Sequence, residues 1–172
     1  MHDDREAFGI LGARALPRLV GTAGLILRDA DAADDAAQET LVRAWRDLPG
    51  LREPDRFDGW LHRILVRACG DQFRARSRQQ RTAESVPERS TSDAAQKVVD
   101  RDEMHRALDM LSVEHRTTIV LRYYLGLSHP EIAEAIGKPI GTVKSRLSRG
   151  LAHLEVALAD HSRPRVTKEE SA

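Results

Sequence analysis

Apolar residues recur three and four positions apart through most of this 172-residue chain. That spacing places them on one face of an α-helix, because successive residues are about 100° apart around the helix axis. Only the segment 117–125 has the β-branched and aromatic composition of a strand, and its helical flanks favour a helix there as well. The pattern therefore predicts an all-α protein.

The expected helices form two groups with a polar segment between them. Residues 79–97 contain no large apolar residue except Val86, so this segment cannot contribute to a core and is predicted to be a flexible linker. We expect two small helical domains over 1–80 and 99–160, joined by a flexible acidic linker over 81–98 and followed by a disordered tail over 161–172. The helices are expected at 6–27, 33–48, 57–78, 99–110, 113–125, 129–136 and 140–158.

Charge is distributed in blocks along the chain, although the total is zero with 27 basic and 27 acidic residues. The neutral total argues against a histone-like protein. Residues 29–47 carry −4, 56–81 carry +5, 82–114 carry −4 and 138–149 carry +4. Two basic segments, each beside an acidic one, indicate two separate surfaces for polyanions. Any single block could equally be an ordinary solvated helix face.

Several other classes of protein are excluded by what the sequence lacks. Cys69 is the single cysteine, so an intramolecular disulfide is impossible, and it is interpreted as a small buried hydrophobe rather than a redox sensor. The seven histidines have no metal-ligand spacing and there is no glycine-rich phosphate loop, so no enzyme, metal site or cofactor is predicted. No apolar run approaches the roughly 18–20 residues that span a bilayer. We therefore expect no membrane insertion and a cytoplasmic location.

Residues 128–158 predict two helices joined by a tight turn. Ser128 and Glu131 have the spacing of a capping box, and Gly137 suits the turn. On the second helix an apolar face is formed by Val143, Leu147, Leu151, Leu154 and Leu158. The opposite face is small, hydroxylated and basic, with Thr142, Lys144, Ser145, Ser148 and Arg149. Such a face suits a DNA major groove, so we interpret the segment as a helix-turn-helix; an amphipathic surface helix is the alternative.

The helix expected at 33–48 has one apolar and one charged face. The apolar face contains Ala33, Ala37, Leu41, Ala44, Trp45 and Leu48, and the charged face contains Asp35, Glu39, Arg43 and Arg46. A mixed-charge face is usually solvated, with Glu39 and Arg43 as an i,i+4 pair. Docking to another protein is the functional alternative.

The helix that starts at Phe57 has a long basic side. It is formed by Arg63, Arg67, Arg74, Arg76 and Arg78, with Phe57, Trp60 and Phe73 nearby. Arginine beside aromatic rings suits single-stranded nucleic acid, whose bases stack and whose phosphates need neutralising. The competing interpretation is that Trp60, Leu61, Ile64 and Leu65 are core residues. That interpretation gives no structural reason for the arginines to cluster.

Two parts of the chain resemble conserved regions of bacterial extracytoplasmic-function sigma factors. The second region of that family is resembled by Asp34-Asp-Ala-Ala-Gln-Glu-Thr-Leu-Val-Arg-Ala-Trp45 and Phe57-Asp-Gly-Trp-Leu-His-Arg-Ile64. The fourth region is resembled by Leu127-Ser-His-Pro-Glu-Ile-Ala133 and Gly137-Lys-Pro-Ile-Gly-Thr-Val-Lys-Ser-Arg-Leu147. The chain departs from the family pattern at Ala36-Ala37, where bulky aliphatics are usual, and at Ile10-Leu11-Gly12, where aromatics are usual.

The resemblance implies a sigma factor that binds core RNA polymerase and directs promoter recognition, DNA melting and transcription initiation. It implies that the polymerase clamp coiled coil is docked by Asp35, Gln38, Glu39 and Arg43, and that the apolar part of the second domain grips the flap. It further implies minus-ten contacts by Arg52, Arg56, Trp60, Arg63, Arg67, Arg74 and Arg76. The minus-thirty-five element would be read by Thr142, Lys144, Ser145, Arg146, Ser148 and Arg149.

The family commonly has an anti-sigma factor as an additional partner, and its acidic linker would lie along a channel that otherwise carries nucleic acid. The alternative function is a stand-alone helix-turn-helix regulator that binds duplex DNA without polymerase.

Overall fold

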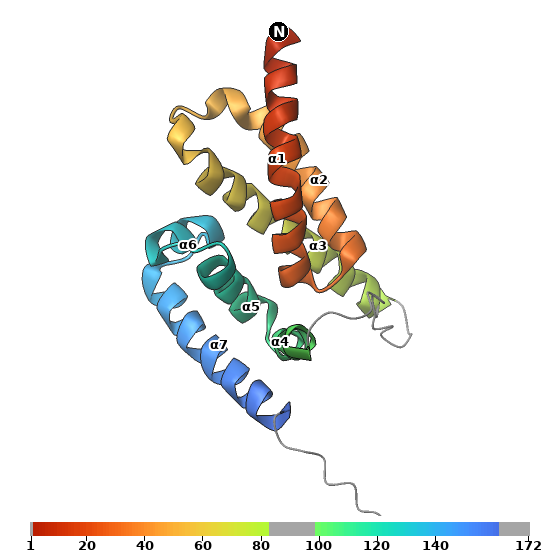
Figure 1. Ribbon diagram of the computed structural model, residues 1–172, viewed down its shortest axis with the longest axis vertical. Helices are drawn as coiled ribbons and strands as arrows, with labels where there is room; N and C mark the ends of the chain where they lie inside the picture. Colours follow the sequence, from red (N-terminus) through yellow and green to blue (C-terminus); the bar gives the residue numbers. More distant parts are fainter. Residues whose placement is uncertain (1, 83–98, 162–172) are drawn as a thin grey trace, which may run out of the picture.

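The computed structural model describes residues 2–82 and 99–161, and it contains helices without strands in that part of the chain (Figure 1). The all-α prediction with two helical groups is confirmed. The predicted linker and tail lie outside the described residues, except where the last turns of two helices enter them. The elements are α1 (His2–Leu27), α2 (Ala30–Asp47), the 3₁₀ turns η1 (Leu48–Gly50) and η2 (Pro54–Arg56), α3 (Phe57–Thr82), α4 (Val99–Asp109), α5 (Val113–Ile119), the π-helical turn η3 (Val120–Tyr124), α6 (His129–Ile136) and α7 (Ile140–His161).

A sharp reversal joins α1 to α2. Arg28 ends α1 in the left-handed conformation, with φ 57°, and its N–H donates to the Gly24 carbonyl at 2.9 Å. Asp29 then caps α2 by accepting a hydrogen bond from the Ala32 N–H at 2.8 Å. This cap explains why α2 begins at Ala30, three residues before its predicted start.

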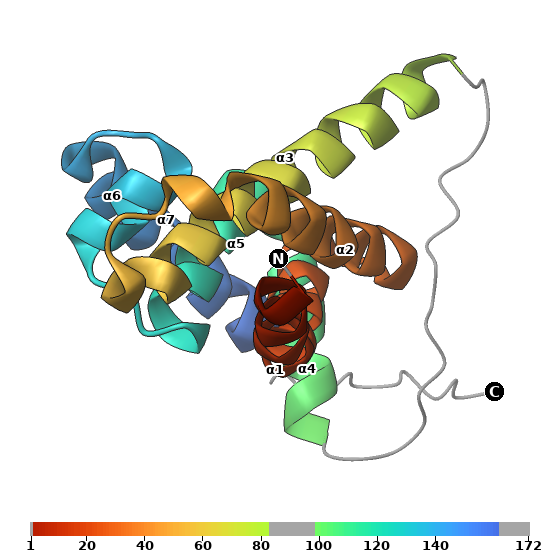
Figure 2. The same ribbon diagram turned by 90° about the horizontal axis from the view of Figure 1, so that it is seen from above.

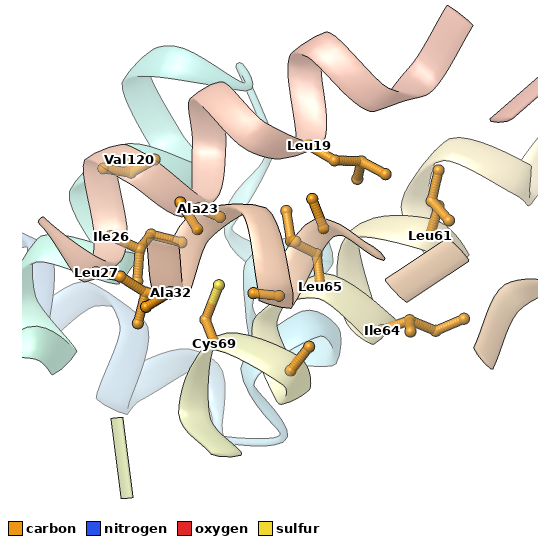
Figure 3. Packing of buried hydrophobic residues seen from close by; sticks show 14 of the residues in the cluster. Leu19, Ala23, Ile26, Leu27, Ala32, Leu61, Ile64, Leu65, Cys69 and Val120 are labelled. Carbon is orange, nitrogen blue, oxygen red and sulfur yellow. The ribbon is translucent and has the colours of Figure 1, made fainter. Parts of the chain in front are cut away.

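The first core lies between α1, α2 and α3 (Figure 3). α1 contributes Leu19, Ala23 and Ile26, and α3 contributes Leu61 and Leu65. α2 contributes mainly alanines: Ala32, Ala33, Ala36, Ala37 and Ala44. Small side chains let two helices approach closely, and a Cβ built on Gly24 would lie only 4.0 Å from the Ala33 Cβ. The departure at Ala36-Ala37 is therefore accommodated by close helix packing, and both residues are fully buried.

The second core lies between α4, α5, η3, α6 and α7, and its buried side chains are aliphatic. The predicted capping box is confirmed, because the Ser128 N–H donates to the Glu131 carboxylate at 2.7 Å while the Ser128 hydroxyl faces the Glu131 N–H. Gly137 has φ 64° and the Lys138 N–H donates to the Ala133 carbonyl, which closes the turn after α6. The predicted apolar face of α7 is also confirmed: Val143, Leu147 and Leu154 are buried, and Leu151 and Leu158 are half-buried.

The two helical regions pack against each other. α3 lies against α6, and α1 lies against α5 and η3 (Figure 1). Val120 of η3 is buried in the first core, while Leu25 and Val66 of the first region pack on the second core. Seen from above, the C-terminal half of α3 extends away from the other helices (Figure 2). The fold thus leaves that part of α3 and the outer face of α7 open.

α1 has the length and composition that would allow a helix to cross a membrane. The segment Arg5–Leu27 of α1 has the length and, at 1.4, the mean hydropathy of a membrane span. It is not an uninterrupted apolar run, because Arg14 and Arg18 lie within it. Core helices pass the same test, and Leu19, Ala23 and Ile26 of α1 are buried against α2 and α3.

Candidate nucleic-acid and protein interfaces

The outer face of α7 is basic and open. Because Val143 and Leu147 face the core, Lys144, Ser148 and Arg149 are exposed on the other side, and Thr142, Ser145 and Arg146 are half-exposed. Within the part of the chain that the structure describes, Lys144, Arg146 and Arg149 form no ion pair. All six residues predicted for duplex recognition therefore lie on one helix, with three cations available to phosphates or bases.

Close packing of α7 on α5 fixes the position of this face. A Cβ on Gly150 would lie 2.9 Å from the Ile119 Cδ1 and 3.3 Å from the His115 Cβ, so only glycine fits without movement of its neighbours. The glycine lets α7 lie flat on α5 just beyond Arg149. This constraint was not predicted, because nothing local in the sequence distinguishes Gly150 from other helical glycines.

A groove of about 460 Å³ runs between α2 and α3. The four residues predicted to dock a protein all line it: Asp35, Gln38, Glu39 and Arg43. Val42 adds an apolar side chain that is 62% exposed, and α3 closes the other wall with Ala68, Asp71, Gln72 and Ala75. The groove thus has charged side chains at its rim and a small apolar area between them. This composition suits a protein partner better than a small molecule.

Arg43 is held in place at the edge of this groove. Its Nε donates to Glu39 at 2.7 Å, which confirms the predicted i,i+4 pair, and both its terminal nitrogens lie 3.1 Å from Asp71 Oδ2. The bond to Glu39 raises the pKa of Arg43. Burial alone would raise the pKa of Asp71, but its bonds from Arg74 and Arg43 lower it overall. Asp71 was missed in the sequence, although its i,i+3 spacing to Arg74 was a usable signal.

The arginines of α3 and its preceding loop do not share one environment. Arg52 and Arg67 are exposed, while Arg56 pairs with Glu53 at 2.7 Å. Arg63 pairs with Glu134 of α6, and Arg74 pairs with Asp71 at 2.5 Å. The sequence offered no structural reason for the arginine cluster, but the structure supplies carboxylate partners for several of its members.

Arg76 has the most buried of these partners. It donates to Asp29 at 2.6 Å, and the side chain of that aspartate is 11% exposed. Burial by itself would raise the pKa of Asp29, but the bonds from the Ala32 N–H and from Arg76 lower it overall. Arg76 therefore stabilises the N-terminal cap of α2 in addition to contributing positive charge.

The aromatic and aliphatic residues at the start of α3 divide between core and surface. Leu61, Ile64 and Leu65 are buried, which confirms their interpretation as core. Trp60 is half-buried: it packs against the first core, and its ring lies 5.9 Å from that of Phe57. Trp60 is thus only partly covered by the first core, while Arg52 and Arg56 in the loop before α3 are exposed.

The remaining candidate chemistry is structural. Burial raises the pKa of the Cys69 thiol to about 12, which fits the interpretation as a small buried hydrophobe. His62 is buried with Nδ1 unpaired, and burial together with Arg18 lowers its pKa. The His115 and His153 rings meet edge to face at 5.6 Å. Among the described residues no group of three or more His, Cys, Asp or Glu could hold a metal ion.

Comparison with known protein families finds two matching sequence profiles. Residues 13–79 match Sigma-70 region 2, and residues 101–154 match Sigma-70 region 4. The RNA polymerase sigma-H factor of Pseudomonas aeruginosa is 30% identical over 169 residues, covering 90% of this chain and 88% of the relative. The ECF RNA polymerase sigma factor SigM of Mycobacterium tuberculosis is 36% identical over 151 residues, covering 88% of this chain and 76% of the relative.

Two solved structures are similar over nearly the whole chain. The sigma factor RpoE, in a co-crystal with the anti-sigma factor NepR from Bartonella quintana, has a TM-score of 0.78 at 30% identity, covering 92% of this chain and 99% of that one. CnrH, in complex with the cytosolic domain of CnrY, has a TM-score of 0.63 at 30% identity, covering 92% of this chain and 91% of that one.

Proposed function

The chain belongs to the extracytoplasmic-function sigma factors of RNA polymerase. We propose that three of its surfaces have separate roles in that function: the outer face of α7, the groove between α2 and α3, and the basic side of α3 with the loop before it. As a sigma factor it binds core polymerase and directs promoter recognition, DNA melting and initiation. The stand-alone regulator is not favoured, since such a protein has no need of a Sigma-70 region 2. Sigma factors are regulatory subunits, and we propose a non-catalytic role and a cytoplasmic location for this chain.

The outer face of α7 is proposed to read the minus-thirty-five duplex. Lys144 and Arg149 are exposed cations without ion pairs among the described residues, and Thr142, Ser145, Arg146 and Ser148 lie beside them. A recognition helix of a helix-turn-helix enters the major groove with such a face. This open basic face, opposite a buried aliphatic stripe, is the observation that carries the proposal.

The groove between α2 and α3 is proposed to dock the clamp coiled coil of core polymerase. Asp35, Gln38, Glu39 and Arg43 form its α2 wall, and Val42 supplies an exposed apolar contact. A helical partner with basic and apolar side chains would match this wall. The exposed apolar residues of the second region are proposed to contact the flap.

The loop before α3 and the basic side of α3 are proposed to hold the opened minus-ten element. Arg52 and Arg67 are exposed, and the half-buried Trp60 is the aromatic ring proposed to contact an unstacked base. Arg56, Arg63, Arg74 and Arg76 would reach phosphates only by exchanging their present carboxylate partners. The domains are proposed as 1–80 and 99–160, joined by a linker at 81–98 and followed by a tail at 161–172.

An anti-sigma factor is the further partner that we propose. The RpoE relative, at 30% identity over nearly all of this chain, was crystallised with one. This chain has the same two helical regions, so a single inhibitory polypeptide could contact both.

Transcription in vitro with purified core polymerase on a library of genomic fragments tests the proposal. We expect transcripts that depend on the protein and start downstream of a shared two-part motif. The Lys144→Ala/Arg149→Ala variant should lose most of these transcripts, while Arg14→Ala, which removes an exposed arginine of α1, should keep them. Transcription no different from that of core polymerase alone would refute the proposal.

A further inference from the structure

α5 packs against α7 (Figure 1), and a pair of histidines lies at their contact. The rings of His115, in the first turn of α5, and His153 of α7 have centroids 5.6 Å apart and planes inclined at 69°. Gly150 lets the helices approach here, since a Cβ on it would lie 3.3 Å from the His115 Cβ. His115 is half-buried, and its Nδ1 is buried without a hydrogen-bond partner among the described residues, whereas His153 is exposed. Beyond packing two helices together, the pair therefore presents one imidazole to solvent.

The exposed histidine continues the basic face of α7. At about 100° per residue, His153 falls between Arg146 and Arg149 around the helix axis, one turn beyond Arg149. Neither arginine has an ion pair in the part of the chain that the structure describes. The side of α7 that adjoins α5 thus carries a row of three nitrogen-bearing side chains, formed by Arg146, Arg149 and His153, and His115 lies behind the last of them.

The position of His153 along α7 suits a phosphate contact better than a base contact. A recognition helix reaches base edges with its N-terminal residues, and His153 lies about 16 Å beyond Thr142 along the helix axis, at ~1.5 Å per residue. The major groove is only about 12 Å wide. A side chain this far along the helix is therefore expected at the rim of the groove, where the phosphates lie. An imidazole N–H can donate to a phosphate oxygen, and the bond is stronger when the ring is protonated.

The surroundings of the pair disfavour its protonation in the free protein. Burial, followed by the neighbouring His153, lowers the pKa of His115. Glu114 of α5 opposes this effect in part, while Arg146 and Arg149 of α7 lower the pKa further. Phosphates bound along the row would counter the charge of these two arginines and so favour the protonated form.

Other charged groups near α5 are engaged elsewhere. Arg116, the next residue of α5, donates to backbone carbonyls of α1 and α4. Arg28, just beyond α1, pairs with Asp109 of α4 at 2.6 Å, and Arg122 of η3 donates to the Leu127 carbonyl at 2.9 Å. The row on α7 is therefore the place where a bound polyanion would change the charge around the histidines most.

We propose that His153, with His115 behind it, is a further phosphate contact of the α7 face, and that the pair takes up one proton when duplex DNA binds. The inference rests on the proposed role of α7 in binding that duplex. Only one proton is taken up, because the two rings are in contact and a first charge opposes a second. Since the complex binds more protons than the free protein, affinity for the duplex rises as the pH falls through the range in which the pair titrates.

Binding of the full chain to a DNA duplex at two pH values tests this contact. Fluorescence anisotropy of a duplex that carries a pH-insensitive dye, at low salt, gives the affinity. The wild-type protein should bind about 3- to 10-fold more tightly at about pH 6 than at about pH 8, and its salt slope should be larger at the lower pH by up to about one unit. His115→Gln/His153→Gln should reduce the difference in affinity to less than about twofold. His105→Gln, in α4 and outside the row, is the matched control and should behave as wild type.

Two single variants keep the test independent of helix packing. His153→Gln changes an exposed residue, so it serves if circular dichroism shows that the double variant does not fold. His153→Arg places a permanent positive charge at the same position. At about pH 8 it should bind the duplex about as tightly as the wild-type protein binds at about pH 6, a gain that a purely structural role of the pair would not produce.

The outcomes separate this contact from the proposed role of α7. Wild-type pH dependence in His153→Gln, or no gain in affinity for His153→Arg at about pH 8, overturns the phosphate contact. Lys144→Ala/Arg149→Ala is measured alongside. If it loses affinity while the histidine variants keep the wild-type pH dependence, the contact alone fails. If it binds the duplex as tightly as wild type, the proposed role of α7 fails and the contact fails with it.

Discussion

α3 and α7 are both long helices with basic side chains, yet the two present their charge in different ways. In the described part of the chain Lys144 and Arg149 of α7 have no ion pair, so they can bind a polyanion without first leaving a carboxylate partner. The arginines of α3 are largely engaged, with carboxylate partners on α6, on α3 itself and at the start of α2: Arg63 with Glu134, Arg74 with Asp71, and Arg76 with Asp29. A similar positive charge in the sequence therefore does not mean that the charged side chains are equally available for binding.

This difference suggests an order of events. Exposed ion pairs contribute only about 0–1 kcal/mol, so nucleic acid can displace them, whereas a pair with a buried carboxylate is retained. The Arg63 and Arg74 pairs belong to the first kind, and the Arg76 pair approaches the second. We expect α7 to bind DNA in its present form, and α3 to bind after some of its arginines have changed partners.

The largest expected effect is at α7. Lys144→Ala/Arg149→Ala should lower the affinity of the polymerase-bound protein for minus-thirty-five duplex by roughly 10- to 100-fold, and should lower the salt slope by about one unit per lost phosphate contact. Fluorescence anisotropy over a series of salt concentrations measures both. An unchanged slope, or an equal loss in Arg14→Ala, would show that α7 is not the available basic surface.

The groove between α2 and α3 comes next. Asp35→Ala/Glu39→Ala should weaken binding to core polymerase by about tenfold, because rim charges contribute to association without being needed for the fold. Asp34→Ala is the control, as Asp34 is exposed on α2 outside the groove. Surface plasmon resonance gives the affinities and circular dichroism the fold. Core affinity that is the same in both variants would contradict a docking role.

Within α3 itself, the stabilities of Arg76→Ala and Arg67→Ala test whether a paired arginine and an exposed arginine differ in their structural role. Arg76→Ala should lower the free energy of unfolding by about 1 kcal/mol, because it removes the partner of the Asp29 cap. Arg67→Ala should change stability by less than about 0.5 kcal/mol, since Arg67 is exposed. Urea unfolding measures both. Equal stabilities would mean that Arg76 has no structural role.

The smallest effect is a pH dependence at the contact of α3 with the second region. Burial, followed by Arg18, lowers the pKa of His62, so the folded state resists protonation. The unfolded state takes up the proton as the pH falls below about 6.5, and stability should therefore decrease from there downward. His62→Gln should flatten this part of the stability profile, because it removes the group whose pKa differs between the folded and unfolded states. Parallel profiles for wild type and His62→Gln would contradict the assignment.

Features determined by local interactions could be predicted from the sequence. The capping box at Ser128, the turn at Gly137 and the apolar face of α7 depend on residues within one or two turns, and the structure confirms all three. The Glu39–Arg43 pair was predictable for the same reason.

Contacts between distant residues were not predictable. Arg28 and Asp109 are 81 residues apart, Arg63 and Glu134 are 71 apart, and Arg116 reaches a carbonyl 90 residues away. No periodicity or spacing relates such residues, because their proximity depends on how the two regions pack. The availability of each arginine, which decides its role in binding, therefore emerged only from the structure.

We infer that this chain recognises promoters as a subunit of polymerase and not alone. Binding of one promoter duplex, measured by anisotropy with the free chain and with its complex with core polymerase, tests this most directly. We expect weak, strongly salt-dependent binding without sequence preference for the free chain, and tight, sequence-specific binding for the complex. Tight and specific binding by the free chain alone would contradict the account.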